Sequence, residues 1–475
     1  METEKRLAQY VYDSKYNDLP PESIDVIKKV VLTIMGTTLA GATAEGCEAI
    51  LAQVKEWGGK EEATILVYGG KVPACNAVMV NSFMARALDF CDAMSPGIHI
   101  GSSAVPVALA SAELAGGCSG KDFLAALVLG TEIAARINSV SDYDGFDPTG
   151  VCSIFAAAAV AGKILGLNPR QMLNALALAF NRAGGSFQSN IDGSLAVRAI
   201  QGFVSQGGLV CAQLARRGIT GPENFIEGTY GYLHLYGKDS YPPQMVIAEL
   251  GKRLEANKII FKKYPSCGCT IASTDAILDL VREIDLTPEN VARVEIRVSP
   301  YAYKLAGHQF ELGDNPKVNA QFSIQYCVAN GLLRRNSKLH HFDEVNVTDD
   351  KVLELVKKVH VFADPSLGNP DAQGGSASTH LSVRMKVVTK EGSVYHKDVD
   401  IPRGNPKNPL AEEEHRERFH DCIDYANKRA PEASIDKIVS LVGRLEKVED
   451  VRNLIPLLLL SQEHTIAARG NAMGE

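Results

Sequence analysis

Apolar side chains return every three or four positions through most of the first 265 residues, the spacing of one buried helix face. Residues 121–137 are a clear example. Residues 168–185 begin with Asn168 at a cap position and Pro169 at the first helical position, and they end at glycine. Alanine-rich stretches such as 156–162 allow helix axes to approach closely, so we predict a compact helical bundle.

The pattern changes after the segment KKYPSCG, which ends at residue 268. Beyond it, apolar and polar residues alternate as in strands, and helical spacing occurs only in short segments. The predicted elements are a strand at 294–298, a hairpin around a Glu-Gly turn at 380–402, and helices at 321–335 and 349–359. Helical spacing returns at 408–430.

These patterns predict a mainly α protein with two domains. Residues 1–266 together with 407–475 would form a large, all-helical domain. Residues 267–406 would form a smaller, inserted α+β lid domain, and a cleft between domains is a usual place for a small-molecule site. The length of 475 residues agrees with two domains, since one hydrophobic core rarely serves more than about 250–300 residues.

Charge and composition exclude several classes of partner. The formal net charge is −7 and no dense stripe of Lys and Arg appears, which argues against nucleic acid. The first 20 residues are charged from the second position and lack the apolar run of a secretory signal. The longest uncharged runs fall short of the roughly 18 residues that a membrane span needs. We therefore expect no membrane contact and a cytoplasmic location.

The ten cysteines are expected to be reduced and mostly buried in that compartment. Only Cys267 and Cys269 stand close together, and no second pair follows at zinc or iron–sulfur spacing. The sequence therefore predicts no metal site.

One histidine in the first 233 residues stands beside two acidic residues. The segment LDFCDAMSPGIHIGSS (88–103) holds Asp89, Asp92 and His99. His99 can act as an acid or a base near neutral pH, and Asp89 could orient its ring, as carboxylates do in hydrolytic triads. The structural alternatives are a helix cap for the carboxylates and a bond to a loop carbonyl for the imidazole. We predict that this segment belongs to an active site.

The same segment resembles the "LDFDD…HPSS…P" motif of the MmgE/PrpD family, which includes 2-methylcitrate dehydratase, cis-aconitate decarboxylase and iminodisuccinate epimerase. The resemblance covers essentially the whole chain and implies a large helical domain with a smaller α+β lid, a homodimer, and no metal or organic cofactor. Further blocks resemble the family in the same order: YDGFDPTGVCSIFAAAAVAGKILGLN (143–168), LARRGITGPENFIEGTYGYLHLYG (214–237), FKKYPSCGCTIASTDA (261–276), QFSIQY (321–326) and PRGNPKNPL (402–410).

The resemblance also implies site residues. Asp89 and His99 match the family's active-site Asp and His, and Lys262 matches the lysine of its "K-x-Y-P" segment. Lys263 is adjacent, and one lysine of the pair is expected to face solvent; the motif favours Lys262 for the site.

Other positions depart from the family's pattern. Ala93 stands where a threonine is usual, Asp147 where "GFHPT" has histidine, and Arg198 where "TKP" has lysine. Thr270 and Ile271 stand near the place of a further histidine.

Removing a proton beside a carboxylate requires a base, and it requires cations or donors that hold the resulting enediolate. Arg198 and Lys262 are candidate cations, and Tyr143 is a candidate proton donor. Because Arg198 lies in an otherwise apolar stretch, either a substrate carboxylate or an internal one, such as Asp147, must balance its charge. Ser102, in a Gly-Ser-Ser segment at a predicted helix start, could hold an anion. The candidate substrate-binding residues are therefore Arg198, Ser102, Asp147 and Lys263.

The predicted function is a cofactor-independent lyase of MmgE/PrpD type that acts on a small di- or tricarboxylate by proton abstraction beside a carboxylate, as hydratases and dehydratases do. Epimerisation or isomerisation and decarboxylation are alternatives, because they pass through the same kind of carbanion. A family member that binds carboxylates without catalysis is another alternative, motivated by the departures. The expected partners are the small carboxylate substrate and, by resemblance, a second copy of the chain.

Overall fold

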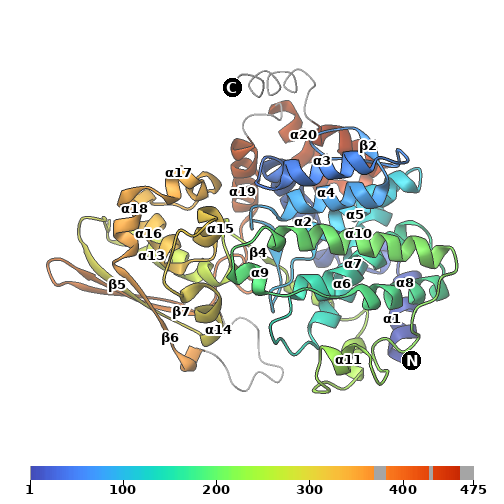
Figure 1. Ribbon diagram of the computed structural model, residues 1–475, viewed down its shortest axis with the longest axis horizontal. Helices are drawn as coiled ribbons and strands as arrows, with labels where there is room; N and C mark the ends of the chain where they lie inside the picture. The colour runs from blue at the N-terminus through green and yellow to red at the C-terminus, as the bar shows by residue number, and fades with distance from the viewer. Residues whose placement is uncertain (1, 368–380, 427–431, 460–475) are drawn as a thin grey trace.

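The computed structural model describes residues 2–367, 381–426 and 432–459. Helices predominate in these residues, so the chain is mainly α, as predicted. Figure 1 shows two lobes: helices build the one on the right, and the one on the left holds a four-stranded sheet with its helices. No helix in the described part of the chain is long and apolar enough to cross a membrane.

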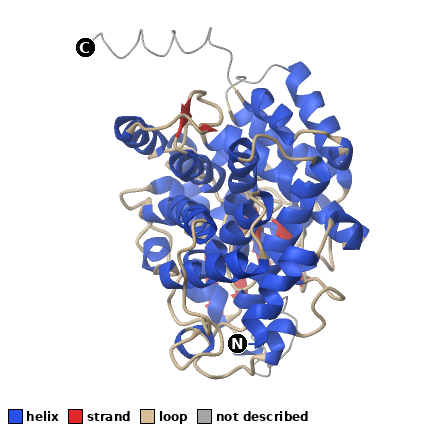
Figure 2. Ribbon diagram, turned by 90° about the vertical axis from the view of Figure 1, so that its right-hand side faces the viewer, coloured by secondary structure: helices blue, strands red, loops and turns tan. Residues whose placement is uncertain are grey.

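The helical lobe combines helices from both ends of the chain, and seen from its own side its regular elements are mostly helices joined by loops (Figure 2). Its longer helices are α1 (Glu2–Asp13), α2 (Pro21–Gly41), α3 (Cys47–Trp57), α4 (Ala74–Arg86), α5 (Gly101–Leu114), α6 (Gly120–Asn138), α7 (Pro148–Ile164), α8 (Pro169–Arg182), α10 (Ala196–Arg216), α19 (Glu412–Tyr425) and α20 (Glu432–Gly443). Helices α19 and α20 pack against α2, so the end of the chain returns to its beginning.

The predicted helices at 121–137 and 168–185 are confirmed by α6 and α8. The start of α8 follows from its cap residues. The side-chain oxygen of Asn168 accepts a hydrogen bond from the Gln171 backbone N–H at 2.9 Å, and the Gln171 side chain accepts one from the Asn168 backbone N–H at 3.1 Å. This reciprocal pair satisfies two backbone donors that would otherwise lack partners at the helix start.

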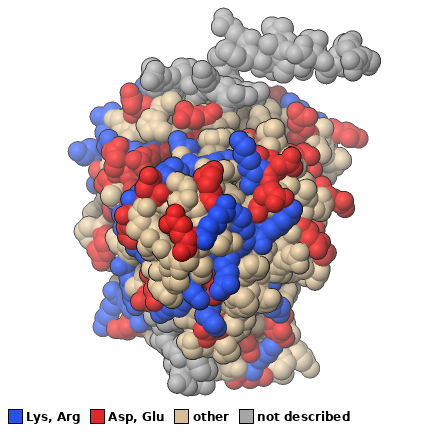
Figure 3. Space-filling model, turned by 90° about the vertical axis from the view of Figure 1, so that its left-hand side faces the viewer, with Lys and Arg blue, Asp and Glu red and all other residues tan. Residues whose placement is uncertain are grey.

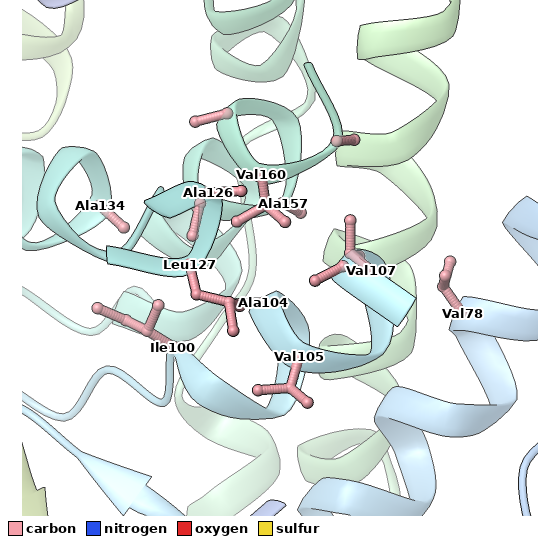
Figure 4. Packing of buried hydrophobic residues seen from close by; sticks show 14 of the residues in the cluster. Val78, Ile100, Ala104, Val105, Val107, Ala126, Leu127, Ala134, Ala157 and Val160 are labelled. Atoms are coloured by element: carbon pink, nitrogen blue, oxygen red, sulfur yellow. The ribbon is translucent and has the colours of Figure 1, made fainter. Parts of the chain in front are cut away.

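Small residues allow the central helices to pack closely, as predicted. Aliphatic side chains, including Ala104, Leu127 and Val160, pack where α5, α6 and α7 meet (Figure 4). A Cβ placed on Gly130 would lie 2.4 Å from Val160 Cγ2, nearer than non-bonded carbon atoms can approach. Helices α6 and α7 therefore come together because position 130 has no side chain.

The helical lobe is not all-helical, which corrects the prediction. It contains two short antiparallel pairs: β1 (Ala63–Thr64) with β2 (Lys71–Val72), and β3 (Asp92–Ala93) with β4 (Ile260–Phe261). Strands of two residues leave no periodic pattern in a sequence. The second pair matters for the site, because it joins the segment after α4 to the segment that leads into Lys262.

The α+β lobe is built on a sheet with the strand order β6-β5-β7-β8. Strand β5 pairs parallel to β6 and antiparallel to β7, and β7 and β8 form the predicted hairpin. Its main elements are α13 (Ile271–Glu283), β5 (Val291–Val298), α15 (Pro316–Gln321), α16 (Ile324–Arg334), α18 (Asp350–Val356), β6 (Val359–Ala363), β7 (Val383–Thr389) and β8 (Val394–Val399).

Two predicted helices of this lobe differ from the structure at their ends. The segment 321–335 divides into the end of α15 and helix α16, because Ser323 accepts a hydrogen bond from the Tyr326 backbone N–H and begins a new helix. The predicted helix at 349–359 ends at Val356, and Val359 begins β6. Val359 pairs with Val294 of β5, a partner 65 positions away that local periodicity cannot reveal.

Each lobe has its own apolar core. The second core includes Tyr264 and continues through the side chains of the sheet to Val387. The domain boundaries after residues 266 and 406 stay a prediction. On the face that Figure 3 shows, acidic and basic side chains alternate over the α+β lobe instead of forming a stripe of one sign.

Candidate active site

A cavity lies between the two lobes and is lined by side chains from both. Its volume is ≈ 90 Å³, several times the roughly 10–15 Å³ that one water molecule needs. Most of the wall is apolar, with Ile200, Tyr301 and Phe322 among its residues. The ionisable groups in the wall are Arg86, Asp89, His99, Asp147, Lys262, Cys267, Cys269, Tyr301 and Arg403. A small apolar cavity with a few converging charges is typical of a site for a small ligand.

Three buried charges meet at one edge of the cavity. Lys262 Nζ lies 2.8 Å from Asp89 Oδ2 and also donates to the Asp89 backbone carbonyl at 3.2 Å. The other carboxylate oxygen, Oδ1, accepts a hydrogen bond from Arg86 Nη1. Burial alone would raise the pKa of Asp89, but Lys262 and Arg86 together hold it well below its ordinary value. Asp89 is therefore a carboxylate at any pH near neutral, and two cations against one anion leave one positive charge.

Local backbone geometry brings these groups together. Helix α4 ends at Arg86, and Asp89 has a φ of 51°, a left-handed conformation that Asp adopts more readily than most residues. Arg86 and Asp89 thus sit one turn apart at a helix end. The β3–β4 pair, with Asp92 opposite Phe261, places Lys262 next to them.

His99 lines the same cavity and is 8% exposed. Its Nδ1 lies 2.7 Å from the Asp92 backbone carbonyl, which can only accept, so Nδ1 carries the proton and Nε2 has the free lone pair. Burial is the main reason that the pKa of His99 is well below its ordinary value, and the charges of Arg86 and Lys262 act in the same direction. The ring is therefore a neutral base near pH 7.

Two comparisons relate the chain to known proteins. The sequence models of the MmgE/PrpD N-terminal and C-terminal domains match residues 5–244 and 264–443. The chain belongs to the MmgE/PrpD family.

Curated relatives of this MmgE/PrpD chain align along almost its whole length. Cis-aconitate decarboxylase of Aspergillus terreus (strain NIH 2624 / FGSC A1156) is 26% identical over 468 residues, which cover 93% of each chain. Cis-aconitate decarboxylase of Homo sapiens is 25% identical over 95% of this chain and 93% of its own, and that of Mus musculus is 25% identical over 95% and 92%. These relatives are enzymes.

The carboxylate of Asp89 does not orient His99 in this MmgE/PrpD structure. It is occupied by Arg86 and Lys262, and the ring nitrogen of His99 bonds to the backbone of Asp92. The expectation of a triad-like pair is therefore wrong, whereas the structural alternative of a loop carbonyl as the partner of the imidazole is observed.

The start of α5 is not open to a substrate anion. The Gly101 backbone N–H donates to Asp92 Oδ2 at 3.0 Å, so an internal carboxylate occupies this helix end. Ser102 is fully buried, and its hydroxyl lies 3.5 Å from the Ala85 carbonyl, outside the cavity wall. The prediction that Ser102 holds an anion is not supported by its position.

Arg198 lies behind the cavity wall, although its neighbours in α10, Val197 and Ile200, line it. It donates to the Glu45 backbone carbonyl at 2.9 Å. In the described part of the chain no ion pair joins Arg198 to Asp147, whose carboxylate caps α7 by accepting from the Thr149 backbone N–H at 2.8 Å. Asp147 is therefore not the internal partner of Arg198; burial raises the pKa of Asp147, and Arg86 is the cation that opposes the rise.

The two neighbouring lysines face different surroundings, as expected. Lys263 Nζ lies 3.0 Å from Glu414 Oε1, beside a separate, more open pocket against α19. The prediction of Lys263 as a substrate-binding residue is not supported by this position. Tyr143 is one layer behind the cavity, with its ring 6.2 Å from that of Tyr301, and burial raises its pKa to about 12.

Several wall residues were missed from the sequence. Arg86 had a visible signal, because a cation three positions before Asp89 at the end of an apolar helix requires a buried partner. Cys267 and Cys269 are buried, as expected, but their spacing gave no sign that they line a cavity. In the described residues no group of His, Cys, Asp or Glu could hold a metal ion. Arg403 approaches from a distant segment, and its guanidinium is paired with Glu414 at 2.6 Å.

Proposed function

We propose that the chain is a lyase that works without a metal or organic cofactor and acts on a small di- or tricarboxylate through a carbanion beside a carboxylate. The observation that carries the proposal is the neutral base His99 in one cavity with the Arg86–Asp89–Lys262 cluster. The cluster's surplus positive charge suits an anionic substrate, and the neutral imidazole suits removal of a proton.

In a dehydration, His99 Nε2 takes the proton from the carbon beside a substrate carboxylate. The electron pair spreads onto that carboxylate, and Lys262 and Arg86 stabilise the doubly charged enediolate. The pair then forms the carbon–carbon double bond as hydroxide leaves from the neighbouring carbon with a proton from an acid of the site. Hydration is the same sequence in reverse.

Decarboxylation is a second candidate, and the curated relatives favour it, because they are named cis-aconitate decarboxylases. There the carbon–CO2 bond breaks, the electron pair stays on carbon, and the same cations stabilise it. The carbanion then takes a proton instead of losing a leaving group. Reprotonation from the other face would give an epimerase, which remains an alternative.

The α+β lobe would act as a lid. Residues of this lobe, Cys267, Tyr301 and Phe322 among them, line the cavity that holds His99, so its movement would open or close the site. Roles remain for two further residues: Tyr143, behind the wall, would support the ring of Tyr301, and Asp147, in the wall, would hold the start of α7 beside the site. We further propose a homodimer, which rests on the family resemblance.

The test is exchange of substrate hydrogen with deuterium oxide, measured by mass spectrometry for malate, citrate, methylcitrate, aconitate and aspartate-derived acids. A dehydratase incorporates deuterium into a hydroxy acid, whereas a decarboxylase releases CO2 and incorporates deuterium only into its product. His99→Gln should lower the rate at least about 100-fold, as loss of a general base does. His420→Gln is the matched control, because His420 is exposed on α19. Full exchange in the His99 variant would remove His99 from the mechanism.

A further inference from the structure

Two cysteines belong to the wall of the cavity. Cys267, Gly268 and Cys269 all line it, and both cysteine side chains are buried, at 8% and 5% exposed. The interaction between the two thiols shifts their pKa values in opposite directions. A cysteine that serves only packing is expected against apolar neighbours, whereas the charges of both Lys262 and Asp89 act on Cys267.

Cys267 is the one cysteine among the ten, all within the described residues, whose pKa is lowered. The hydrogen bond from the Cys269 thiol is the main cause that lowers the pKa of Cys267, and the charge of Lys262 acts in the same direction against burial and Asp89. The pKa of Cys269 is raised, first by its interaction with Cys267 and then by burial. The remaining eight cysteines, all within the described residues, have pKa values that burial raises.

The position of Cys267 is fixed relative to the charged cluster by Gln321. The Cys267 backbone N–H donates to the Gln321 carbonyl at 2.8 Å. The Gln321 side-chain amide donates to the Leu88 carbonyl at 2.7 Å, directly before Asp89. One residue of the α+β lobe thus holds both the thiol segment and the loop of the carboxylate.

We propose that Cys267 is a catalytic residue of this cavity: its thiol gives a proton to the reacting substrate, and Lys262 and the Cys269 thiol stabilise the thiolate that remains. The inference rests on the proposed function and supplies its missing acid. His99 is a neutral base and cannot itself donate, because its only ring proton is bonded to the Asp92 carbonyl.

The proton and electron balance is complete for both candidate reactions. In a dehydration, the Cys267 S–H proton joins the leaving hydroxide to form water, while His99 keeps the proton taken from carbon. In a decarboxylation, the S–H proton goes to the carbon that loses CO2, and the S–H electron pair stays on sulfur. Afterwards the thiolate regains a proton from solvent. In the dehydration, the imidazolium of His99 gives its extra proton to solvent.

The first experiment tests the thiol without a substrate. The intact protein is treated with iodoacetate or iodoacetamide at pH 7, and labelled cysteines are located by mass spectrometry. Cys267 should react before the other nine, because the thiolate is the nucleophile. Relative to glutathione, iodoacetate should be favoured about tenfold over iodoacetamide, since Arg86 and Lys262 attract its carboxylate. Reaction at another cysteine first, or no preference for the anionic reagent, would overturn the proposal.

The second experiment measures turnover. Cys267→Ala should lower the rate about 100-fold, the lower range for loss of a general acid, with Cys118→Ser as a half-buried control outside the cavity. Cys269→Ala should raise the pKa of Cys267, so the alkaline limb of kcat/KM moves to higher pH, which a packing role would not cause. Unchanged turnover in folded Cys267→Ala, judged by circular dichroism, overturns the proposal.

The two proposals can fail separately. If wild-type protein neither exchanges nor converts any acid of the panel, the proposed function fails. Selective reaction of Cys267 with iodoacetate then still supports an acid–base thiol in an anion-binding cavity. If Cys267 does not react selectively, the proposal for Cys267 fails as well.

Discussion

The centre of the helical lobe and the wall of the cavity are equally buried but differ in composition. Where α5, α6 and α7 meet, aliphatic side chains such as Ala104, Leu127 and Val160 pack against one another (Figure 4). At the end of α4, one helix away, the buried side chains are Arg86, Asp89 and Lys262. Burial stabilises the first group, whereas the second loses hydration that its internal bonds must replace.

The aliphatic side chains stabilise the fold, whereas the fold positions the charged side chains for chemistry. Replacing a buried ion pair by apolar side chains is often neutral or stabilising, so stability alone does not explain the cluster. Buried charges that line a cavity, with the pKa of Asp89 held below its ordinary value, point to a functional site. Variants of the charged cluster should therefore affect activity more than stability, and variants of the aliphatic core should affect stability more than activity.

The largest effect is expected from Lys262→Met. Loss of a cation that stabilises developing charge should lower turnover about 100- to 1,000-fold, and the incompletely paired Asp89 should lower the free energy of unfolding by about 3 kcal/mol. Lys263→Met is the matched control; its partly exposed pair with Glu414 contributes only about 0–1 kcal/mol. Deuterium exchange measures turnover, and urea unfolding measures the free energy of unfolding. Equal losses from the two variants would contradict the assignment of the cluster.

Leu127→Ala should have the next largest effect, on stability alone. Leu127 is 1% exposed between aliphatic neighbours, and such truncations lower the free energy of unfolding by about 2–5 kcal/mol. Turnover per folded molecule should stay unchanged, because the cavity wall does not include this residue. Leu214→Ala, at an exposed position of α10, is the control for urea unfolding. A loss of turnover in folded Leu127→Ala would show that the two regions are coupled.

The smallest effect is expected from a change of pH from 7.5 to 6.5. The pKa of His99 is well below 6.5 in the folded protein, so the base stays neutral over this interval and kcat/KM barely changes. Activity should fall only at lower pH, as the lowered pKa is reached. The unfolded chain takes up this proton first, so the stability that His99 contributes is present above about pH 6.5 and is lost as the pH falls. An acid limb at or above pH 6.5 would exclude His99 as the base.

Much of the fold was predictable because it depends on local pattern. The helix at 121–137 and the hairpin at 380–402 were confirmed, since apolar periodicity and turn residues lie within a few positions of each other. Strand β6 was missed because its partner β5 lies far away in the sequence. The β3–β4 pair was missed because two-residue strands have no periodicity.

The site shows the same division. Placing Asp89, His99 and Lys262 in one cavity was within reach of the sequence, because motif and family resemblance pointed to them. The hydrogen-bond partners of the site residues could not be predicted from the sequence. The sequence suggested Asp89 for His99 and Asp147 for Arg198, but the structure shows the Asp92 carbonyl and the Glu45 carbonyl. Backbone carbonyls are present at every position, so no residue type announces them as partners.

By itself, the sequence determined that this chain is a mainly helical member of its family and which segment contains its histidine and carboxylates, because periodicity and motif order are properties of the chain. Only the tertiary structure decided which groups meet. In the structure Lys262 lines the cavity and Lys263 lies outside it. Asp89 is paired with two cations, and Cys267 lines the same cavity. The physical reason is that direction and burial set the pKa and partners of a side chain, and both arise from contacts between segments far apart in sequence.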